Sequence, residues 1–375
     1  MLLALFVALR IAGTGGDPSV FVHAGDRYVD AQVAPAELTV RRDSVGYDGQ
    51  FVYRLALDPL TSVQRDFGIA FDTAQYRQQR IGLPALAWVV DRTTPLSTLW
   101  SILAVNVAAL VLAAYAGARL AAGRGRSPLW ALLLGLSPGL VVGLSRGLTE
   151  PLSWAALMVA LWCWSERRFA VAGAALAVGV LTRETVAVAV AALGVLLLVE
   201  QVRARTWRPR DRLPAYLALA LPTACYFGWQ AFLTARWGSA PAGTSVVNLG
   251  VPVLDIARTL FTTELQGRPL RPGWPATVLW SVERVWMLAL MLWAVARVRR
   301  TLLPVSSQVV WGAATAIALS VGGWAYDIQF LRAATEGVTM SVLLLIATPG
   351  RWTTRVLGAS AAVTAVVAAW FVVHG

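Results

Sequence analysis

The stretch LSTLWSILAVNVAALVLAAYAGA at residues 96–118 contains no charged residue, and it indicates the kind of fold that the whole chain adopts. A helix that crosses a lipid bilayer needs roughly 20 consecutive apolar residues. About eleven stretches approach this requirement, at residues 1–12, 96–118, 128–145, 150–165, 169–182, 186–200, 213–235, 276–296, 303–325, 333–348 and 355–373. We therefore expect an all-α integral membrane protein with about eleven transmembrane helices, folded as a single polytopic domain over residues 1–375.

The composition supports this class and excludes others. Hydrophobic residues make up 57% of the chain and charged residues only 14%, which excludes a soluble enzyme. The two cysteines, Cys163 and Cys225, lie in apolar runs, and the two histidines, His23 and His374, lie far apart in the sequence. Neither a disulfide framework nor a histidine-rich metal site can be built from these residues, so carboxylates must hold any metal ion.

The positive charges indicate how the chain is oriented. With the N-terminus on the cytoplasmic side, the inside turns carry the arginine clusters at residues 119–126, 167–168, 203–212, 297–300 and 351–355. Only Glu166, Glu200 and Asp211 accompany them, so the other 17 of the 20 acids lie outside. Basic turns are typical of the cytoplasmic face. The net charge of +12 therefore indicates membrane orientation and no nucleic-acid partner, and we expect a multi-pass protein of the plasma (inner) membrane.

This orientation leaves two long outer loops, at residues 13–95 and 236–275. The first loop contains a short apolar run at residues 81–92. If this run crossed the membrane, every later span would invert and the arginine clusters would face outward. We expect instead an amphipathic helix that lies in the outer interface and is broken by Pro84.

The densest polar chemistry of the first loop lies at residues 41–59, RRDSVGYDGQFVYRLALDP. Asp48 sits between the aromatic ring of Tyr47 and Gly49, which allows close backbone approach. Gln50 and Arg54 follow within six residues and add an amide and a guanidinium group. This combination makes the segment a candidate active site, whereas a turn-capping aspartate with ordinary interfacial packing is the alternative interpretation.

The sequence resembles a known family at this point. The segment YDGQFVYR at 47–54, with Tyr76, Arg77 and RIGLP at 80–84, looks like the first-loop motif of bacterial polytopic proteins of cell-surface glycopolymer formation. These proteins are related to the GT-C glycosyltransferases. The segment LTRET at 181–185 resembles an Arg-Glu pair that such proteins carry between two helices. Val52 departs from the pattern, because relatives usually have an aromatic residue there.

The resemblance implies a GT-C-like fold, an outer-face active site and an inverting transfer. The donor would be a sugar on polyprenyl phosphate, and the acceptor a glycan or glycolipid. An attacking hydroxyl group must lose its proton, and Asp48 is the natural general base. The leaving phosphate needs cations, and guanidinium groups match its oxygens in a bidentate fork. The candidate substrate-binding residues are Tyr47, Gln50, Arg54, Arg80, Arg183, Glu184 and Arg332.

Other interpretations of these residues remain open. Arginines at helix ends are commonly interface anchors, although Arg183 is favoured because Glu184 beside it places a charged pair between two apolar runs. Glu150 begins an apolar helix, where the helix dipole favours a negative charge without any role in binding. Asp43 could join Asp48 as a ligand of a divalent cation, Mg²⁺ or Mn²⁺, if the loop folds back on itself.

Two further function classes compete with a transferase. A transporter or flippase for a lipid-linked saccharide would place polar residues along a path through the bilayer. The predicted spans carry few charges, and the polar residues gather on one face, which favours surface chemistry. A non-catalytic component of an envelope polysaccharide assembly complex is the third class.

Overall fold

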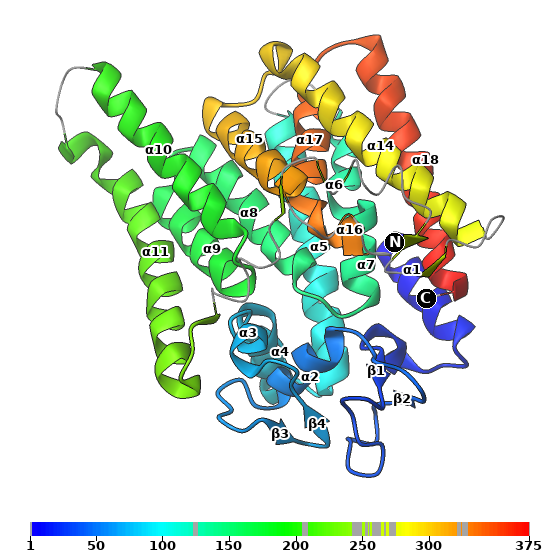
Figure 1. Cartoon of the computed structure of the whole chain (residues 1–375). Coiled ribbons are helices and arrows are strands. Elements are labelled where there is room, and N and C mark those ends of the chain that lie inside the picture. The colour runs from blue at the N-terminus through cyan, green and yellow to red at the C-terminus, as the bar shows by residue number, and fades with distance from the viewer. Residues whose placement is uncertain are drawn as a thin grey trace.

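The computed structural model describes residues 2–122, 127–204, 209–241, 250–251, 254, 256, 264–265, 268–269, 275–320, 324 and 329–374. Each stretch expected to span the membrane contains helix. The helices of the bundle are α1 (Leu2–Gly13), α5 (Thr98–Ala122), α6 (Leu132–Leu136), α7 (Pro138–Ser145), α8 (Glu150–Ser165), α9 (Phe169–Thr182), α10 (Val186–Ala204), α11 (Pro209–Trp237), α14 (Pro275–Arg297), α15 (Val305–Ser320), α16 (Gln329–Ala333), α17 (Thr335–Ile346) and α18 (Arg351–His374). They run up and down across one bundle (Figure 1).

Length and composition qualify only some of these helices as spans. Within the described residues, α5, α10, α14 and α18 are long and apolar enough to cross a membrane, and a fifth span results if the pair around Ser137 counts as one. This pair is the short 3₁₀ helix η2 (Pro128–Ala131) with α6, followed by α7 after a bend of 49°. The bend falls before Pro138, since a proline restrains the residue before it and fits the first turn of a new helix. The count of eleven spans stays a prediction.

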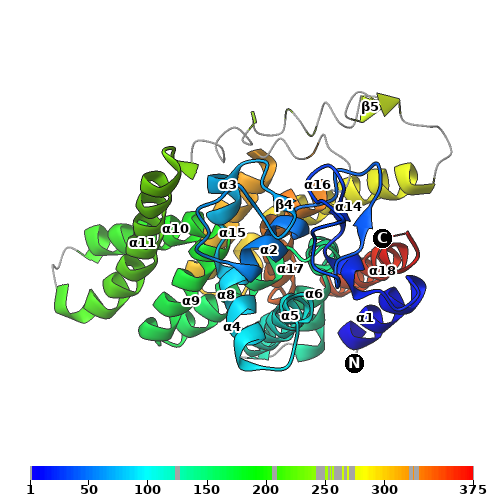
Figure 2. The ribbon, with the colours of Figure 1, turned by 90° about the horizontal axis from the view of Figure 1, so that it is seen from below.

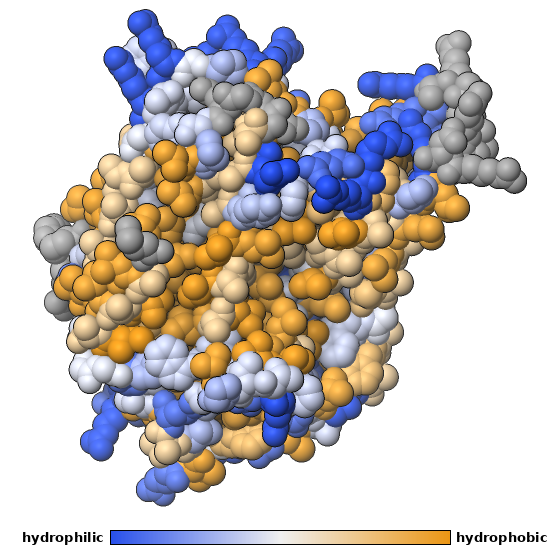
Figure 3. All heavy atoms as spheres, turned by 180° about the vertical axis from the view of Figure 1, so that it is seen from behind, coloured by the Kyte–Doolittle hydropathy of each residue, from blue (hydrophilic) through white to orange (hydrophobic). Residues whose placement is uncertain are grey.

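The surface agrees with a membrane protein. A broad apolar belt crosses the middle of the face shown in Figure 3, and polar residues lie above and below it. The described arginines of the α10–α11, α14–α15 and α17–α18 turns lie at one end of the bundle, and the first loop lies at the other (Figure 1). This separation of basic turns from the loop is the one that the sequence predicts.

The first loop is folded and has its own small core. It contains the 3₁₀ helix η1 (Pro18–Phe21), the parallel pair β1 (Ala24–Gly25) and β2 (Val40–Arg41), α2 (Gly49–Leu57), the antiparallel pair β3 (Arg65–Asp66) and β4 (Ile69–Ala70), α3 (Ala74–Gln78) and α4 (Gly82–Thr93). Val52, Tyr53 and Ile69 are buried together with Leu83 of α4 and Leu99 of α5, so the loop is anchored on the bundle. Seen from below, α2 and α3 lie across the middle of the bundle end (Figure 2).

Three expectations need correction or comment. Pro84 does not break the helix at residues 81–92, because it sits in the first turn of α4, where its missing N–H costs no helical hydrogen bond. The fold is not purely helical, since the first loop forms two-residue strands, and β5 (Glu264–Leu265) pairs with β6 (Arg268–Pro269). Most of the predicted second loop, 236–275, lies outside the described residues.

Candidate active site

Asp48 lies at the centre of a charged network beneath the bundle. It occupies the residue before α2, but its side chain makes no capping hydrogen bond to the helix. Its Oδ2 instead accepts from Arg332 Nη1 at 2.9 Å, and its Oδ1 lies 2.9 Å from Arg77 Nη1. The side chain is 28% exposed, so it remains accessible to a ligand. The structure therefore does not support the turn-capping interpretation of Asp48.

Gly49 lets this motif approach the bundle. A Cβ atom at Gly49 would lie 2.2 Å from the carbonyl oxygen of Arg146 at the end of α7. No side chain fits at that distance, so only glycine allows Asp48 to lie against α7 and α8. The close approach expected from the sequence is confirmed here.

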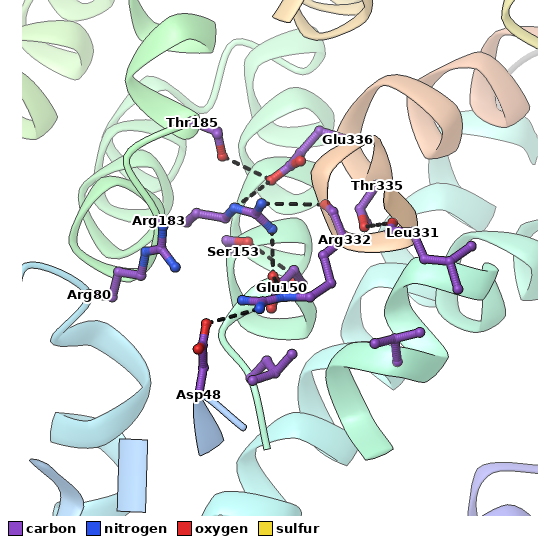
Figure 4. Close-up of polar contacts among 12 residues, drawn as sticks. Asp48, Arg80, Glu150, Ser153, Arg183, Thr185, Leu331, Arg332, Thr335 and Glu336 are labelled. Carbon is purple, nitrogen blue, oxygen red and sulfur yellow. Dashed lines mark hydrogen bonds and ion pairs between the residues drawn. The ribbon is translucent and has the colours of Figure 1, made fainter. Parts of the chain in front are cut away.

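Glu150, at the start of α8, pairs with both Arg332 and Arg183. Its Oε1 accepts from Arg332 Nε at 2.8 Å and lies 3.0 Å from Arg183 Nη1 (Figure 4). Arg183 also lies 3.4 Å from Glu336 and donates to the carbonyl oxygen of Arg332 at 3.3 Å. Glu150 is 1% exposed, so it cannot contact a substrate in this conformation, whereas Asp48 can. Of the two acids that share Arg332, only Asp48 is therefore exposed enough to contact a ligand.

The two sequence motifs meet in three dimensions. Arg80 donates to both carboxylate oxygens of Glu184, at 3.0 and 2.6 Å, and to the hydroxyl oxygen of Tyr76 at 3.0 Å. Next to this pair, a Cβ atom at Gly82 would lie 2.1 Å from Thr182 Oγ1, so α4 packs closely against the end of α9. The RIGLP segment thus positions its arginine against the LTRET segment.

Aromatic rings line the network beside Asp48. The Arg332 guanidinium lies 5.3 Å from the Tyr47 ring centroid, and that of Arg146 lies 5.7 Å from it. Arg77 lies 4.5 Å from the ring centroid of Phe51. Stacking on aromatic faces holds guanidinium groups in place without removing all of their N–H donors.

The electrostatics keep the acids ionised. Burial acts to raise the pKa of Asp48, but the charges of Arg332, Arg77 and Arg80 together hold it well below its usual range. Burial likewise acts to raise the pKa of Glu184, and the Arg80 guanidinium more than offsets this effect and lowers it to about 2. Both carboxylates are therefore negatively charged at neutral pH.

Two predicted substrate-binding residues lie elsewhere in the loop. Gln50 is buried, with its Oε1 accepting from Gly25 N at 3.1 Å and its Nε2 donating to Val45 O at 3.0 Å. Arg54 is fully buried, where it donates to Thr61 Oγ1 at 2.9 Å and lies 3.6 Å from Asp66. These two side chains brace the loop and do not reach the network. The structure thus gives them a different place from the one expected.

The predicted metal site does not fit the residues either. Asp43 is exposed in a turn, where its backbone N–H donates to Asp26 Oδ2 at 2.8 Å. Both oxygens of Asp48 are paired with arginines, whose positive charges disfavour a metal cation beside them. Among the residues that the structure describes, no group of three or more His, Cys, Asp or Glu could hold a metal ion.

Arg77, Glu150 and Glu336 belong to the network but were not among the predicted site residues. Arg77 lies in the first-loop motif. Glu150 and Glu336 share a signal, because each lies in the first turn of an apolar helix, α8 or α17. A carboxylate at such a place needs a cationic partner once it is buried. Arg183 and Glu184 were selected because charges between apolar runs need partners, and this argument applies equally to Glu150 and Glu336.

One solved structure relates this architecture to a known protein. The fold is similar to that of the Archaeoglobus fulgidus oligosaccharyltransferase in its apo form, with a TM-score of 0.50 and 14% identity. At this identity, the similarity is one of overall fold. The similarity covers 99% of this chain but 56% of the oligosaccharyltransferase, so the chain spans little more than half of its length. No family model matches the sequence, and no curated protein matches it.

Proposed function

We propose that this chain is a membrane glycosyltransferase of the GT-C type. It transfers a sugar from a polyprenyl-phosphate donor to a glycan or glycolipid acceptor of the cell envelope, with inversion, at the outer face of a bacterial plasma membrane. The observation that carries the proposal is an ionised, accessible carboxylate, Asp48, bonded to Arg77 and Arg332 at one end of an apolar helical bundle. The fold shared with an oligosaccharyltransferase agrees with it.

The roles follow from what the reaction must move. A lone pair of the acceptor hydroxyl oxygen attacks the anomeric carbon from the face opposite the phosphate. The bond from this carbon to the phosphate oxygen breaks, its electron pair stays on the phosphate, and the hydroxyl proton passes to Asp48. Arg332 and Arg77 bond the departing phosphate, because a guanidinium group has five N–H donors and keeps some for a ligand.

The donor itself would activate the base. Before the donor binds, two arginines hold both oxygens of Asp48 and keep it a weak base. A donor phosphate that binds these arginines partly neutralises their positive charge and places an anion beside Asp48. Both effects raise the pKa of Asp48. The acidic limb of kcat, which reports the substrate complex, should therefore lie at higher pH than that of kcat/KM for the donor. Coincident limbs would refute this coupling.

The direct test is Asp48→Asn, which keeps the size of the side chain but cannot accept the proton. We expect transfer from a radiolabelled polyprenyl-phosphate sugar to fall by at least about 100-fold, the lower bound for a general base. Asp43→Asn is the matched control, because Asp43 is exposed in the same loop. Transfer by Asp48→Asn at the level of the control would remove Asp48 from the mechanism.

The proposed face of the membrane is tested separately. In a variant without Cys163 and Cys225, Asp43→Cys supplies one exposed thiol beside the motif. A maleimide that cannot cross the membrane should label it in intact cells. Labelling only after the membrane is opened would place the loop on the cytoplasmic side and contradict the proposed donor chemistry.

A further inference from the structure

Residues 74–80, which contain α3, separate their side chains by chemistry. Tyr76, Arg77 and Arg80 turn toward the charged network, where Arg77 lies 2.9 Å from Asp48 and Arg80 is bonded to Glu184. The glutamines of the same segment contact the C-terminal part of α11 and the residues after it instead. Gln75 Nε2, for example, donates to Ser239 Oγ at 2.9 Å. One short segment thus joins the site to a helix of the bundle.

Gln78 is the centre of this second contact. It is fully buried, and its Nε2 donates to Pro59 O at 2.9 Å and to Thr61 O at 3.2 Å. Its Oε1 accepts from Trp237 Nε1 at 2.7 Å, and its backbone carbonyl oxygen accepts from Trp229 Nε1 at 3.1 Å. The amide is bonded at both ends, so its orientation is fixed.

Other residues of α11 hold the neighbouring loop. Arg236 Nε donates to Thr61 O at 3.0 Å, and its Nη2 bonds to Leu60 O. Gln230 Nε2 donates to Gln79 Oε1 at 3.4 Å. We call this set of contacts between residues 229–239 of α11 and its C-terminal extension and residues 59–61 and 75–79 of the first loop the α11 clasp.

The clasp matters because α3 cannot hold itself in place. A helix of five residues is far shorter than the roughly 12 to 15 residues that an isolated helix needs for even marginal stability. Its position must come from tertiary contacts. On the site side, Arg77 also donates to Asp72 at 2.8 and 2.5 Å, but Asp72 precedes α3 in the same segment and moves with it. The clasp ties residues 75–79 to α11, whereas the Arg80–Glu184 pair ties only the end of the segment to the bundle.

We propose that the α11 clasp positions Arg77 against Asp48, with Gln78 and Trp237 as positioning residues that do not touch the substrate. As a role in catalysis, this rests on the proposed function. Loss of the bond from Trp237 frees one end of the Gln78 amide and lets α3 shift. Arg77 then releases Asp48 for part of the time.

The test uses Trp237→Phe in the full chain. Phenylalanine keeps an aromatic ring against the small cluster of Phe51, Leu55, Phe71 and Ala74 but removes the indole N–H. Trp88→Phe is the matched control, because Trp88 is an exposed tryptophan of α4 in the same loop. Gln78→Glu is a second variant, because it keeps an acceptor for Trp237 and loses the donor to Pro59 and Thr61.

Two readouts are measured. The first is the rate at which phenylglyoxal modifies Arg77, followed by mass spectrometry with the exposed Arg42 of the first loop as the internal reference. It should rise several-fold in Trp237→Phe and Gln78→Glu and stay unchanged in Trp88→Phe. The second is the acidic limb of kcat/KM for the donor, which reports the free enzyme. It should move to higher pH by roughly one unit, since one adjacent cation lowers the pKa of a carboxylate by about 1–3 units.

The outcomes separate the two proposals. Unchanged Arg77 modification in Trp237→Phe, or faster modification with an unmoved acidic limb, would overturn the positioning role while wild-type transfer still supports the function. If the wild-type protein transfers no sugar but Arg77 modification rises in both clasp variants, the proposed function fails and the clasp still holds Arg77.

Discussion

Glu150→Gln tests the energetic centre of the network. Glu150 Oε1 bridges Arg332 at 2.8 Å and Arg183 at 3.0 Å, and the carboxylate is 1% exposed. Removing one partner of a buried ion pair typically costs about 3–5 kcal/mol, because the remaining charge is left uncompensated. Here Arg332 keeps Asp48, Arg183 keeps Glu336, and glutamine can still accept a hydrogen bond. We therefore expect a loss of roughly 1.5–3 kcal/mol, the size of one hydrogen bond to a charged group.

The assay is equilibrium unfolding in detergent micelles, with Glu166→Gln as the matched control. Glu166 follows the same helix, α8, at its other end, and pairs with Arg168 at 3.1 Å. Both members of that pair are at least 33% exposed, and exposed pairs contribute between 0 and about 1 kcal/mol. The control should therefore unfold close to wild type.

The reasoning fails if both variants unfold alike. An unchanged stability in Glu150→Gln would mean that the two bonds only offset the desolvation of the carboxylate, as happens for some buried pairs. A loss above the upper value would mean that Asp48 and Glu336 do not compensate the two arginines as their geometry indicates.

Three further predictions concern other buried polar groups. The pKa of Glu184 is lowered from 4.5 to about 2, so the ionised carboxylate stabilises the fold fully above pH 4.5 and loses this contribution as the pH falls toward 2. In Glu184→Gln, the unfolding temperature should therefore depend less on pH between these values. Gln50→Leu leaves the buried Gly25 N–H without a partner, so stability should fall by about 1–3 kcal/mol while KM for the donor is unchanged. A raised KM at full stability would return Gln50 to the substrate site. Glu283 of α14 is buried, and neither carboxylate oxygen has a hydrogen-bond partner among the described residues. Because an unpartnered polar group is costly to bury, Glu283→Met should raise the unfolding temperature. A lower unfolding temperature would show that the carboxylate has a partner.

The helices could be predicted because each follows from a local property. The uncharged stretch at 96–118 became α5 over Thr98–Ala122, and hydrophobicity alone is enough for that prediction. The effect of a proline depends on its position in a helix. The bend before Pro138 and the intact helix at Pro84 could be predicted only if the starts of α7 and α4 were known. Boundaries are the least certain part of any prediction from one sequence.

The site could be predicted only in part, because its bonds join distant segments. Asp48 was found from its own neighbours in the sequence, but its partner Arg332 lies 284 residues away. The sequence offers many arginines at helix ends, and nothing local separates Arg332 from an interface anchor. Gln50 and Arg54 share the motif with Asp48, yet they lie on α2, whose turns direct them into the core of the loop.

Charge balance is the rule that would have narrowed the choice. A buried charge in a low-dielectric bundle needs a partner of opposite sign, so acids at the starts of apolar helices predict arginines beside them. Glu150, Glu184 and Glu336 are such acids, and Arg332, Arg80 and Arg183 are their partners. Asp48 differs from these acids because it is 28% exposed although two arginines hold it. The side chains of Glu150, Glu336 and Glu184 are 1%, 11% and 18% exposed. Asp48 is thus the most accessible acid of the network, and this distinction requires the structure.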